Sequence, residues 1–420
     1  MGEPTAFRCI GCGREYPPWS VDYTCPRCGP VAGTLEVLYD YGLLARRFTP
    51  TSFAETRRPS MWRYEELLPV GVERAVPLRV GWTPVYECRT LAGELGLSSL
   101  WFKDDALNPT ASYKDRASAV AVGAARKLDR SAMACASTGN AATSLAGLCA
   151  SIGMPCYIFV PRTAPRPKVA QLIAFGAMVF AVNGSYDQAF DLCTEAADKF
   201  GWYNRSAAIN PMNVEGKKTG ALELWEQLDG EIPDYVLVSV GDGSIVSGLC
   251  KGFTELARVG LTRGVPRVYG VQADGSAAVA HAFQRHARGE ALLPAEEGAK
   301  TFADSIRVGK PRDVVKAVRY VSATQGGFVT ASDEEILAAA HDLPRKTGLF
   351  AEPAAATAYA GLLALRREGA IPAGARVAVF ITGSGLKDPD GVLQGLGKPA
   401  GVPPELAAVE RALAGSDYED

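Results

Sequence analysis

The chain reads Asn108-Pro-Thr-Ala-Ser-Tyr-Lys-Asp-Arg116 directly before an apolar run, Ala117–Ala125. Ser112 is a good N-cap residue and Asp115 follows three residues later, so the pattern predicts a helix with Lys114 in its first turn. A lysine is unfavourable there because its charge opposes the helix macrodipole. A Schiff base with an aldehyde cofactor would neutralise the amine, while a solvated surface lysine is the alternative. This segment alone favours neither.

Two further segments have the pattern of anion-binding turns. An apolar strand is predicted at Ala132–Ala136, followed by Ser137-Thr-Gly-Asn140 and a helix over Ala141–Ile152. A second strand, Tyr235–Val240, precedes Gly241-Asp-Gly-Ser-Ile245, where glycines let backbone N–H groups approach a phosphate. An amine, a polar cradle and a phosphate-binding turn together indicate a phosphorylated aldehyde cofactor, pyridoxal 5′-phosphate.

These motifs and others along the chain resemble those of the threonine synthase family, one of the fold-type II pyridoxal-phosphate enzymes. The matching segments run in order from about residue 7 to residue 388. They are Trp62–Pro69, Gly81–Pro84, Phe102–Arg116, Ala136–Asn140, Ile209–Pro211, Glu215–Thr219 and Thr382–Asp388.

The resemblance implies a role for individual residues. Lys114 is expected to hold the cofactor as an imine and to move the α-proton, Asn140 to bind the ring hydroxyl, and Thr382 to contact the pyridine nitrogen. A hydroxyl at that nitrogen makes the ring a weaker electron sink than a carboxylate would, which suits elimination and replacement better than transamination. The residues expected to bind the cofactor phosphate are Gly241, Asp242, Gly243, Ser244 and Ile245.

The reaction implied by the resemblance converts O-phosphohomoserine and water into threonine and phosphate, by elimination and then addition at Cβ. The expected substrate-binding residues are Ser137, Thr138, Asn210, Asn213 and Lys217. Position 213 departs from the family, which commonly carries Arg there. The amide of Asn213 has neither the positive charge of a guanidinium nor its two parallel N–H donors for a phosphate. Lys217 could supply that charge. A β- or γ-replacement on another activated amino acid, such as O-phosphoserine in a cysteate synthase-like reaction, therefore stays open.

Four of the ten cysteines form two knuckles, Cys9-Ile-Gly-Cys12 and Cys25-Pro-Arg-Cys28. Four thiolates can surround one Zn²⁺ tetrahedrally, and such a site keeps no open position for catalysis. The inner cysteines are separated by twelve residues, fewer than the roughly 15 to 20 of comparable sites. We expect a structural zinc ion; a ribbon that has lost its metal is the alternative.

Composition excludes several other classes of protein. A net charge of −2 and 47% apolar residues do not indicate a nucleic-acid binder, and no run approaches the ~20 apolar residues of a membrane span. Without a signal-peptide pattern at residues 1–8, we expect a cytoplasmic enzyme, and the resemblance implies a homodimer. A nicotinamide-binding oxidoreductase would need G-x-G-x-x-G after Val240, but the third glycine falls too late, at Gly248.

Strands and helices alternate along most of the chain, which predicts an α/β fold with parallel sheets covered by helices on both faces. The resemblance implies the tryptophan synthase β-like, fold-type II architecture. Its parts would be a CxxC ribbon (1–40), a large cofactor-binding domain (41–106 and 213–396), a smaller mobile domain (107–212) and a C-terminal tail (397–420). Further predicted strands are Leu100–Lys103, Cys156–Val160, Met178–Val182, Val268–Gln272 and Val377–Ile381, and further predicted helices are Tyr186–Phe200, Gly220–Leu228, Ser332–His341 and Pro353–Arg366.

Overall fold

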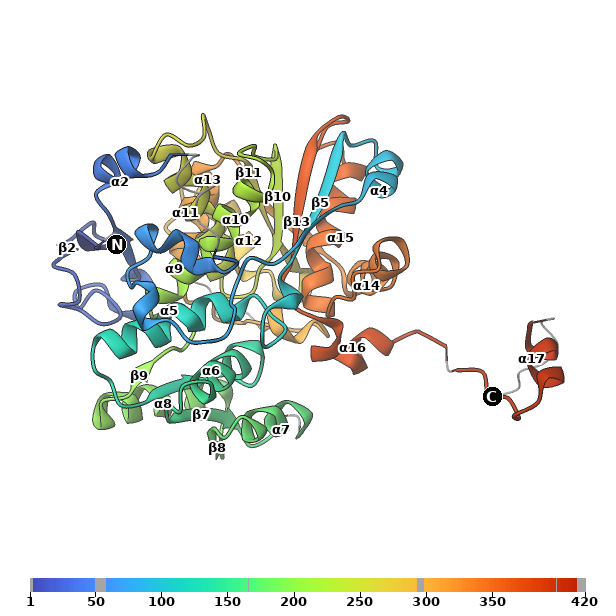
Figure 1. Cartoon of the computed structure of the whole chain (residues 1–420), viewed down its shortest axis with the longest axis horizontal. Coiled ribbons are helices and arrows are strands. Elements are labelled where there is room, and N and C mark those ends of the chain that lie inside the picture. Colours follow the sequence, from blue (N-terminus) through green and yellow to red (C-terminus); the bar gives the residue numbers. More distant parts are fainter. Residues whose placement is uncertain (1–2, 50–57, 165, 293–297, 398, 414–420) are drawn as a thin grey trace.

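The computed structural model describes residues 3–49, 58–164, 166–292, 298–397 and 399–413, and three sheets organise these residues (Figure 1). The smallest is antiparallel, in the order β2-β1-β3, and carries the cysteine-rich segment. Its strands are β1 (Ala6–Cys9), β2 (Glu15–Tyr16) and β3 (Leu35–Leu38). The short helix α1 (Gly29–Ala32) follows the second cysteine knuckle and precedes β3, and the two knuckles lie side by side.

The largest sheet has six strands in the order β12-β11-β10-β13-β5-β4. All neighbouring pairs are parallel except β4 with β5, so the sheet is mixed at one edge only. The strands are β4 (Val85–Glu87), β5 (Ser99–Asp104), β10 (Tyr235–Ser239), β11 (Arg267–Ala273), β12 (Gly327–Ala331) and β13 (Arg376–Ile381).

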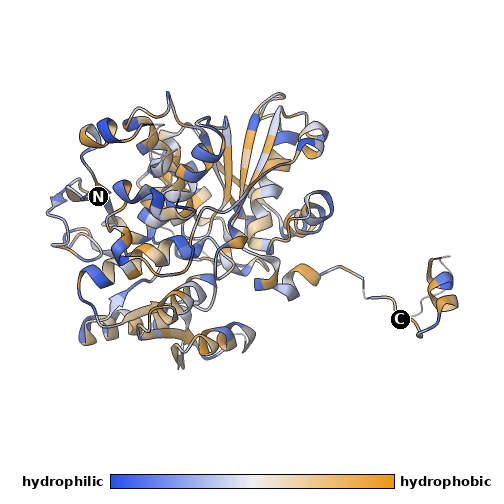
Figure 2. Cartoon of the chain, in the orientation of Figure 1, coloured by the Kyte–Doolittle hydropathy of each residue, from blue (hydrophilic) through white to orange (hydrophobic). Residues whose placement is uncertain are grey.

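Helices cover both faces of this sheet because its central strands are apolar on both faces. Along β10, Val236 and Val238 pack into one hydrophobic cluster, whereas Leu237 packs into another. Figure 1 shows α10 to α13 on one side of the sheet and α14 and α15 on the other, and Figure 2 shows the apolar colouring of the strands between them. These helices are α10 (Thr219–Gln227), α11 (Ser244–Arg258), α12 (Ala278–Ala287), α13 (Val314–Ala323), α14 (Asp333–Thr347) and α15 (Pro353–Arg367). Continuous apolar strands are what a parallel sheet buried on both faces requires.

A parallel four-stranded sheet, in the order β8-β7-β6-β9, forms the third layer. Its strands are β6 (Met133–Ala136), β7 (Cys156–Pro161), β8 (Met178–Val182) and β9 (Tyr203–Asn204), and its helices are α5 (Lys114–Lys127), α6 (Asn140–Ala150), α7 (Arg166–Ala174) and α8 (Tyr186–Phe200). All of these elements lie within 107–212, and the strands of the six-stranded sheet lie before and after that range. The division into domains and the mobility of the smaller one stay predictions.

The α/β fold class is confirmed, and each predicted strand lies within one residue of an observed one. The sequence pattern missed β12, which begins at a Gly-Gly pair and is only partly buried. The C-terminal tail contains a helix, α17 (Leu406–Leu413), which lies apart from the body in Figure 1. Among the described helices, none has the length and apolar content that a membrane crossing needs.

The predicted cap of the helix at Lys114 is wrong in its detail. The helix α5 does begin at Lys114, but the residue before it is Tyr113, no side chain caps it, and the Ser112 hydroxyl has no hydrogen-bond partner. Ser112 instead forms an isolated β-bridge with Gly383, which fixes its backbone away from a capping position. The Asp115 carboxylate turns back to accept from the backbone N–H of Thr110 at 2.7 Å. Tertiary contacts therefore replace the local cap.

Candidate active site

A cavity of about 500 Å³ opens where strands of the two larger sheets end. Its walls include the turns that follow β6, β10 and β13, together with the segment 304–312. Ligand sites of α/β proteins lie at the carboxyl ends of their strands, and the volume is within the range of small-molecule sites, about 300 to 1,000 Å³. The cavity is therefore the candidate active site.

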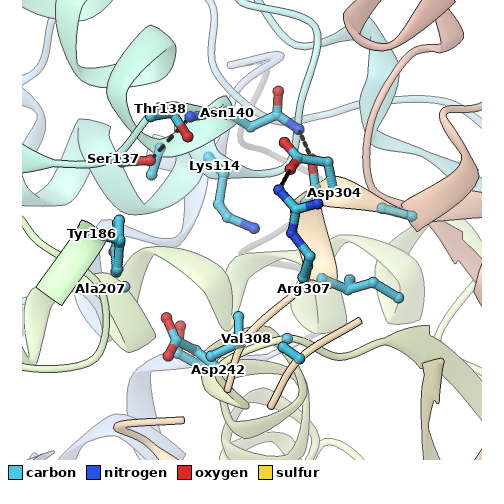
Figure 3. Close-up of a pocket in the computed structure, with 18 of the residues that line it drawn as sticks. Lys114, Ser137, Thr138, Asn140, Tyr186, Ala207, Asp242, Asp304, Arg307 and Val308 are labelled. Atoms are coloured by element: carbon cyan, nitrogen blue, oxygen red, sulfur yellow. Dashed lines mark hydrogen bonds and ion pairs between the residues drawn. The ribbon is translucent and has the colours of Figure 1, made fainter. Parts of the chain in front are cut away.

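Lys114 lies at the centre of this cavity, and Figure 3 shows its amine between the 137–140 turn on one side and Asp242 on the other. The residue is the first of α5, and its backbone position is fixed by the preceding N–H of Tyr113, which donates to the carbonyl of Thr382 at 2.9 Å. Burial and the nearby Arg205 guanidinium lower the pKa of the Lys114 amine. A neutral amine is the form that attacks an aldehyde or accepts a proton.

The turn Ser137–Asn140 lines one wall, as predicted, and leads into α6. The Asn140 amide donates to the Glu352 carboxylate at 2.9 Å, and Ser305 donates to the other oxygen of Glu352 at 3.3 Å. Glu352 is only 3% exposed, and this burial raises the pKa of its carboxyl to about 7. The hydrogen bond to Glu352 thus fixes the orientation of the Asn140 side chain, which also lines the cavity.

The turn Gly241–Ile245 forms the opposite wall and leads into α11, whose first residue is Ser244. Gly243 has a φ of +96°, and a Cβ there would lie 2.8 Å from the Cβ of Ala317, so only glycine fits this turn. The N-terminus of a 15-residue helix attracts an anion. The buried amine of Lys217 donates to the Ser244 hydroxyl and places a basic group beside the turn.

Thr382 lines the cavity at the end of β13. Its hydroxyl lies 3.2 Å from the hydroxyl of Ser239, at the end of the neighbouring strand β10. Two hydroxyls at the carboxyl edge of the sheet form a neutral polar contact for a ring nitrogen, and neither can supply a fixed negative charge there.

Two of the predicted substrate-binding residues, Asn210 and Asn213, do not line the cavity. The Asn210 amide donates to the carbonyl of Asn204 at 2.9 Å, and its oxygen accepts from the N–H of Met212 at the same distance. The Asn213 amide donates to the carbonyls of Arg205 and Ser206, each at 3.2 Å. Both side chains are fully buried and hold the backbone of the segment that follows β9.

Several charged residues that line the cavity were not predicted from the sequence to belong to the site. The clearest are Arg205, Glu352 and Arg307, which belong to loops or helix starts without a recognisable motif. Two signals could have indicated them. Arg205 directly follows a strand, β9, and Glu352 directly precedes Pro353 at the start of an apolar helix.

The four cysteines of the two knuckles form a separate cluster, and none of them lines the cavity. Their sulfur atoms all lie within 4.8 Å of one another, and those of Cys12 and Cys25 are 3.9 Å apart. A tetrahedral Zn²⁺ with bonds of about 2.3 Å places its sulfur ligands about 3.8 Å apart. The donor set and its spacing therefore fit one structural zinc ion.

Known proteins share these features. Residues 76–383 match the family described as pyridoxal-phosphate dependent enzyme. The chain is 37% identical to the threonine synthase of Methanocaldococcus jannaschii over 97% of this chain and 98% of that protein. It is 36% identical to the threonine synthase of Mycobacterium bovis over 83% of this chain and 94% of that one.

Solved structures with the same fold include the processed form of threonine deaminase isoform 2 from Solanum lycopersicum. This structure has a TM-score of 0.62 at 20% identity and covers 77% of this chain and 84% of its own. The serine racemase of Dictyostelium discoideum has a TM-score of 0.60 at 22% identity and covers 72% and 92%.

A lysine amine between a polar cradle and a helix N-terminus, on this fold, defines a pyridoxal-phosphate dependent enzyme. The extent and identity of the matches make the chain a member of the threonine synthase family of these enzymes, so the resemblance is confirmed.

Proposed function

We propose that the protein catalyses the conversion of O-phosphohomoserine and water to threonine and phosphate, using pyridoxal 5′-phosphate. The observation that carries this proposal is the position of the Lys114 amine, which lies between the Ser137–Asn140 turn and Asp242 of the Gly241–Ile245 turn. The similarity to threonine synthases over nearly the whole chain supports the choice of substrate.

The cavity has the donors that this cofactor needs. Lys114 would hold its aldehyde carbon, the Gly241–Ile245 turn and Lys217 its phosphate, Asn140 its ring hydroxyl, and Thr382 its ring nitrogen. When bound, the cofactor supplies an electron sink that stabilises negative charge at the α-carbon of the substrate. Because Thr382 brings no carboxylate to the ring nitrogen, this sink is moderate, which favours elimination and replacement.

Lys114 would also serve as the base and the acid of the reaction. Its lowered pKa favours the neutral amine, which can take the proton from the substrate's α-carbon and later return it. Ser137 and Thr138 would bind the substrate carboxylate beside the start of α6.

The cysteine cluster is proposed to bind one structural Zn²⁺ through Cys9, Cys12, Cys25 and Cys28. Four thiolates would close its coordination sphere, so the ion would stabilise the N-terminal sheet and take no part in the reaction.

The family resemblance supports a homodimer, which size-exclusion chromatography with light scattering would test.

The function is tested by offering O-phosphohomoserine and O-phosphoserine separately to the purified enzyme and following both phosphate release and amino-acid products. Threonine formed from the first substrate supports the proposal, and Lys114→Ala serves as the inactive control. Phosphate release from O-phosphoserine alone would identify the replacement reaction of the cysteate synthase type instead.

A further inference from the structure

Arg205 is a buried arginine that forms no ion pair with the residues that the structure describes. Only 1% of the residue is exposed, its Nε donates to the Ser118 hydroxyl at 3.0 Å, and its Nη2 has no hydrogen-bond partner among the described residues. The residue also lines the cavity. A guanidinium stays protonated under ordinary conditions and is costly to bury unpaired, so this arrangement indicates an anion that arrives with a ligand.

Three other basic residues at the cavity have polar partners. Arg307 forms an ion pair with Asp304 at 2.7 Å, and Arg312 forms one with Asp187 at 2.9 Å. Lys217 donates to Ser244 within the turn that we assign to the cofactor phosphate. Among these four cavity-lining cations, Arg205 is the one whose terminal nitrogen is buried with no acceptor.

The backbone around Arg205 is hydrogen-bonded to β6, the strand that leads into the Ser137–Asn140 turn. The N–H of Arg205 donates to the carbonyl of Ala134 in β6 at 2.8 Å, and the N–H of Ala136 donates to the Ser206 hydroxyl at 3.0 Å. The strand β6 continues directly into Ser137. Arg205 therefore belongs to the same wall as the Ser137–Asn140 turn, whereas Lys217 belongs to the wall formed by the Gly241–Ile245 turn.

Electrostatics favours two bound phosphates in this cavity. Burial and the Arg205 guanidinium lower the pKa of Lys114, and burial together with Lys114 and Arg205 lowers the pKa of Lys217. Burial also lowers the pKa of Arg205. All three residues line the cavity and lie close enough to interact electrostatically. With Lys114 bound to the cofactor, Arg205 and Lys217 are left as one basic side chain on each wall, which suits two phosphate groups: that of the cofactor and that of the substrate.

We propose that Arg205 binds the phosphate group of the substrate amino acid, while Lys217 serves the phosphate of the cofactor. The inference rests on the proposed function, because only a phosphorylated substrate brings a second phosphate. Asn213 is then a positioning residue: its amide holds the carbonyls of Arg205 and Ser206 and so fixes where the guanidinium lies. A guanidinium fork can bind two phosphate oxygens at once.

Arg205→Gln, Arg205→Lys and Lys217→Gln test the assignment in the cofactor-loaded enzyme. Arg205→Gln should raise KM for O-phosphohomoserine and the inhibition constant of inorganic phosphate by at least about 30-fold, since a buried charge-assisted contact is lost. Cofactor affinity, followed by visible absorbance during titration with pyridoxal phosphate, should change less than about 3-fold. Arg205→Lys should recover part of the loss. Lys217→Gln should weaken cofactor binding instead.

Two controls separate binding from folding and from general charge. Arg162→Gln removes an exposed arginine that follows β7 and does not line the cavity, so it should leave both affinities unchanged. Thermal unfolding without substrate should show no loss of Tm in Arg205→Gln, because an unpaired buried charge has been removed. A clear drop in Tm that Arg205→Lys restores, with KM unchanged, would make Arg205 a structural residue and overturn the inference.

The remaining outcomes distinguish this inference from the proposed function. If the wild type makes threonine and Arg205→Gln retains its KM, the inference is wrong and the function stands. If Arg205→Gln loses the cofactor, Arg205 binds the cofactor phosphate and the inference is again wrong. If the wild type does not use O-phosphohomoserine, the proposed function fails. Inorganic phosphate binding to the two cofactor-loaded proteins then tests Arg205: loss of binding in the variant supports a phosphate site, and equal binding overturns it.

Discussion

Replacing Glu352 by Gln should change how the stability of the cofactor-free protein depends on pH. Burial raises the pKa of the Glu352 carboxyl from 4.5 to about 7, although the nearby Lys114 opposes this shift. The native state therefore keeps this proton up to about pH 7, whereas the unfolded chain loses it near pH 4.5. Stability contributed by the proton is present at low pH and is lost as pH rises between these two values. At about 1.4 kcal/mol per pKa unit, ionisation of Glu352 costs the native state about 3 kcal/mol.

Denaturant unfolding of the wild type and of Glu352→Gln, between pH 4.5 and pH 8, measures this effect. The glutamine has no charge to bury and can still accept from the Asn140 amide. The stability of the variant relative to the wild type should therefore rise by about 3 kcal/mol from pH 4.5 to pH 8. Glu410→Gln, on the exposed face of α17, is the matched control. A stability difference that stays constant with pH, or falls, would refute the argument that Glu352 is held protonated.

Three further predictions concern the amine, the core and the cysteine cluster. Lys114→Ala should lower kcat by at least about 10³-fold, because general acid–base catalysis alone contributes up to about 10⁴-fold; turnover within tenfold of the wild type would contradict this. Glu223 is fully buried against Arg116 at 2.6 Å and Lys103 at 2.8 Å, so Glu223→Gln should destabilise the protein by about 3 to 5 kcal/mol in urea unfolding. A loss below 1 kcal/mol would show that the two cations find other partners. Cys25→Ser, or a strong chelator, should remove one zinc per chain by elemental analysis and lower Tm with little change in kcat; equal metal content in variant and wild type would oppose a four-cysteine site.

Much of the fold could be predicted because its strands carry a strong local signal. The central strands β10 and β13 are short apolar runs bounded by glycine or charged residues, and burial on both faces makes such runs unambiguous. β12 lacked this signal because its middle residues are only partly buried at the edge of the sheet. The start of α5 was placed correctly, but its cap was not, since a bridge between Ser112 and Gly383 depends on distant parts of the chain.

In the site too, residues with a local sequence pattern could be predicted, whereas residues placed by contacts with distant parts of the chain could not. Residues of the two turns lie in the cavity because glycine and small polar residues directly after a strand must lie at the sheet's carboxyl edge. Asn210 and Asn213 also follow a strand, but their side chains turn to neighbouring backbone carbonyls, which no sequence pattern reveals. Arg205 and Glu352 are recognised only by their surroundings: a buried guanidinium whose Nη2 has no acceptor among the described residues, and a buried carboxyl.

The most direct test concerns the bond between Lys114 and the cofactor. The purified enzyme, loaded with pyridoxal phosphate, is reduced with borohydride, digested and mapped by mass spectrometry. A phosphopyridoxyl group on the peptide that contains Lys114, with loss of visible absorbance, is the predicted result. Label on another lysine, or none on a cofactor-loaded protein, would contradict the assignment of this cavity as the active site.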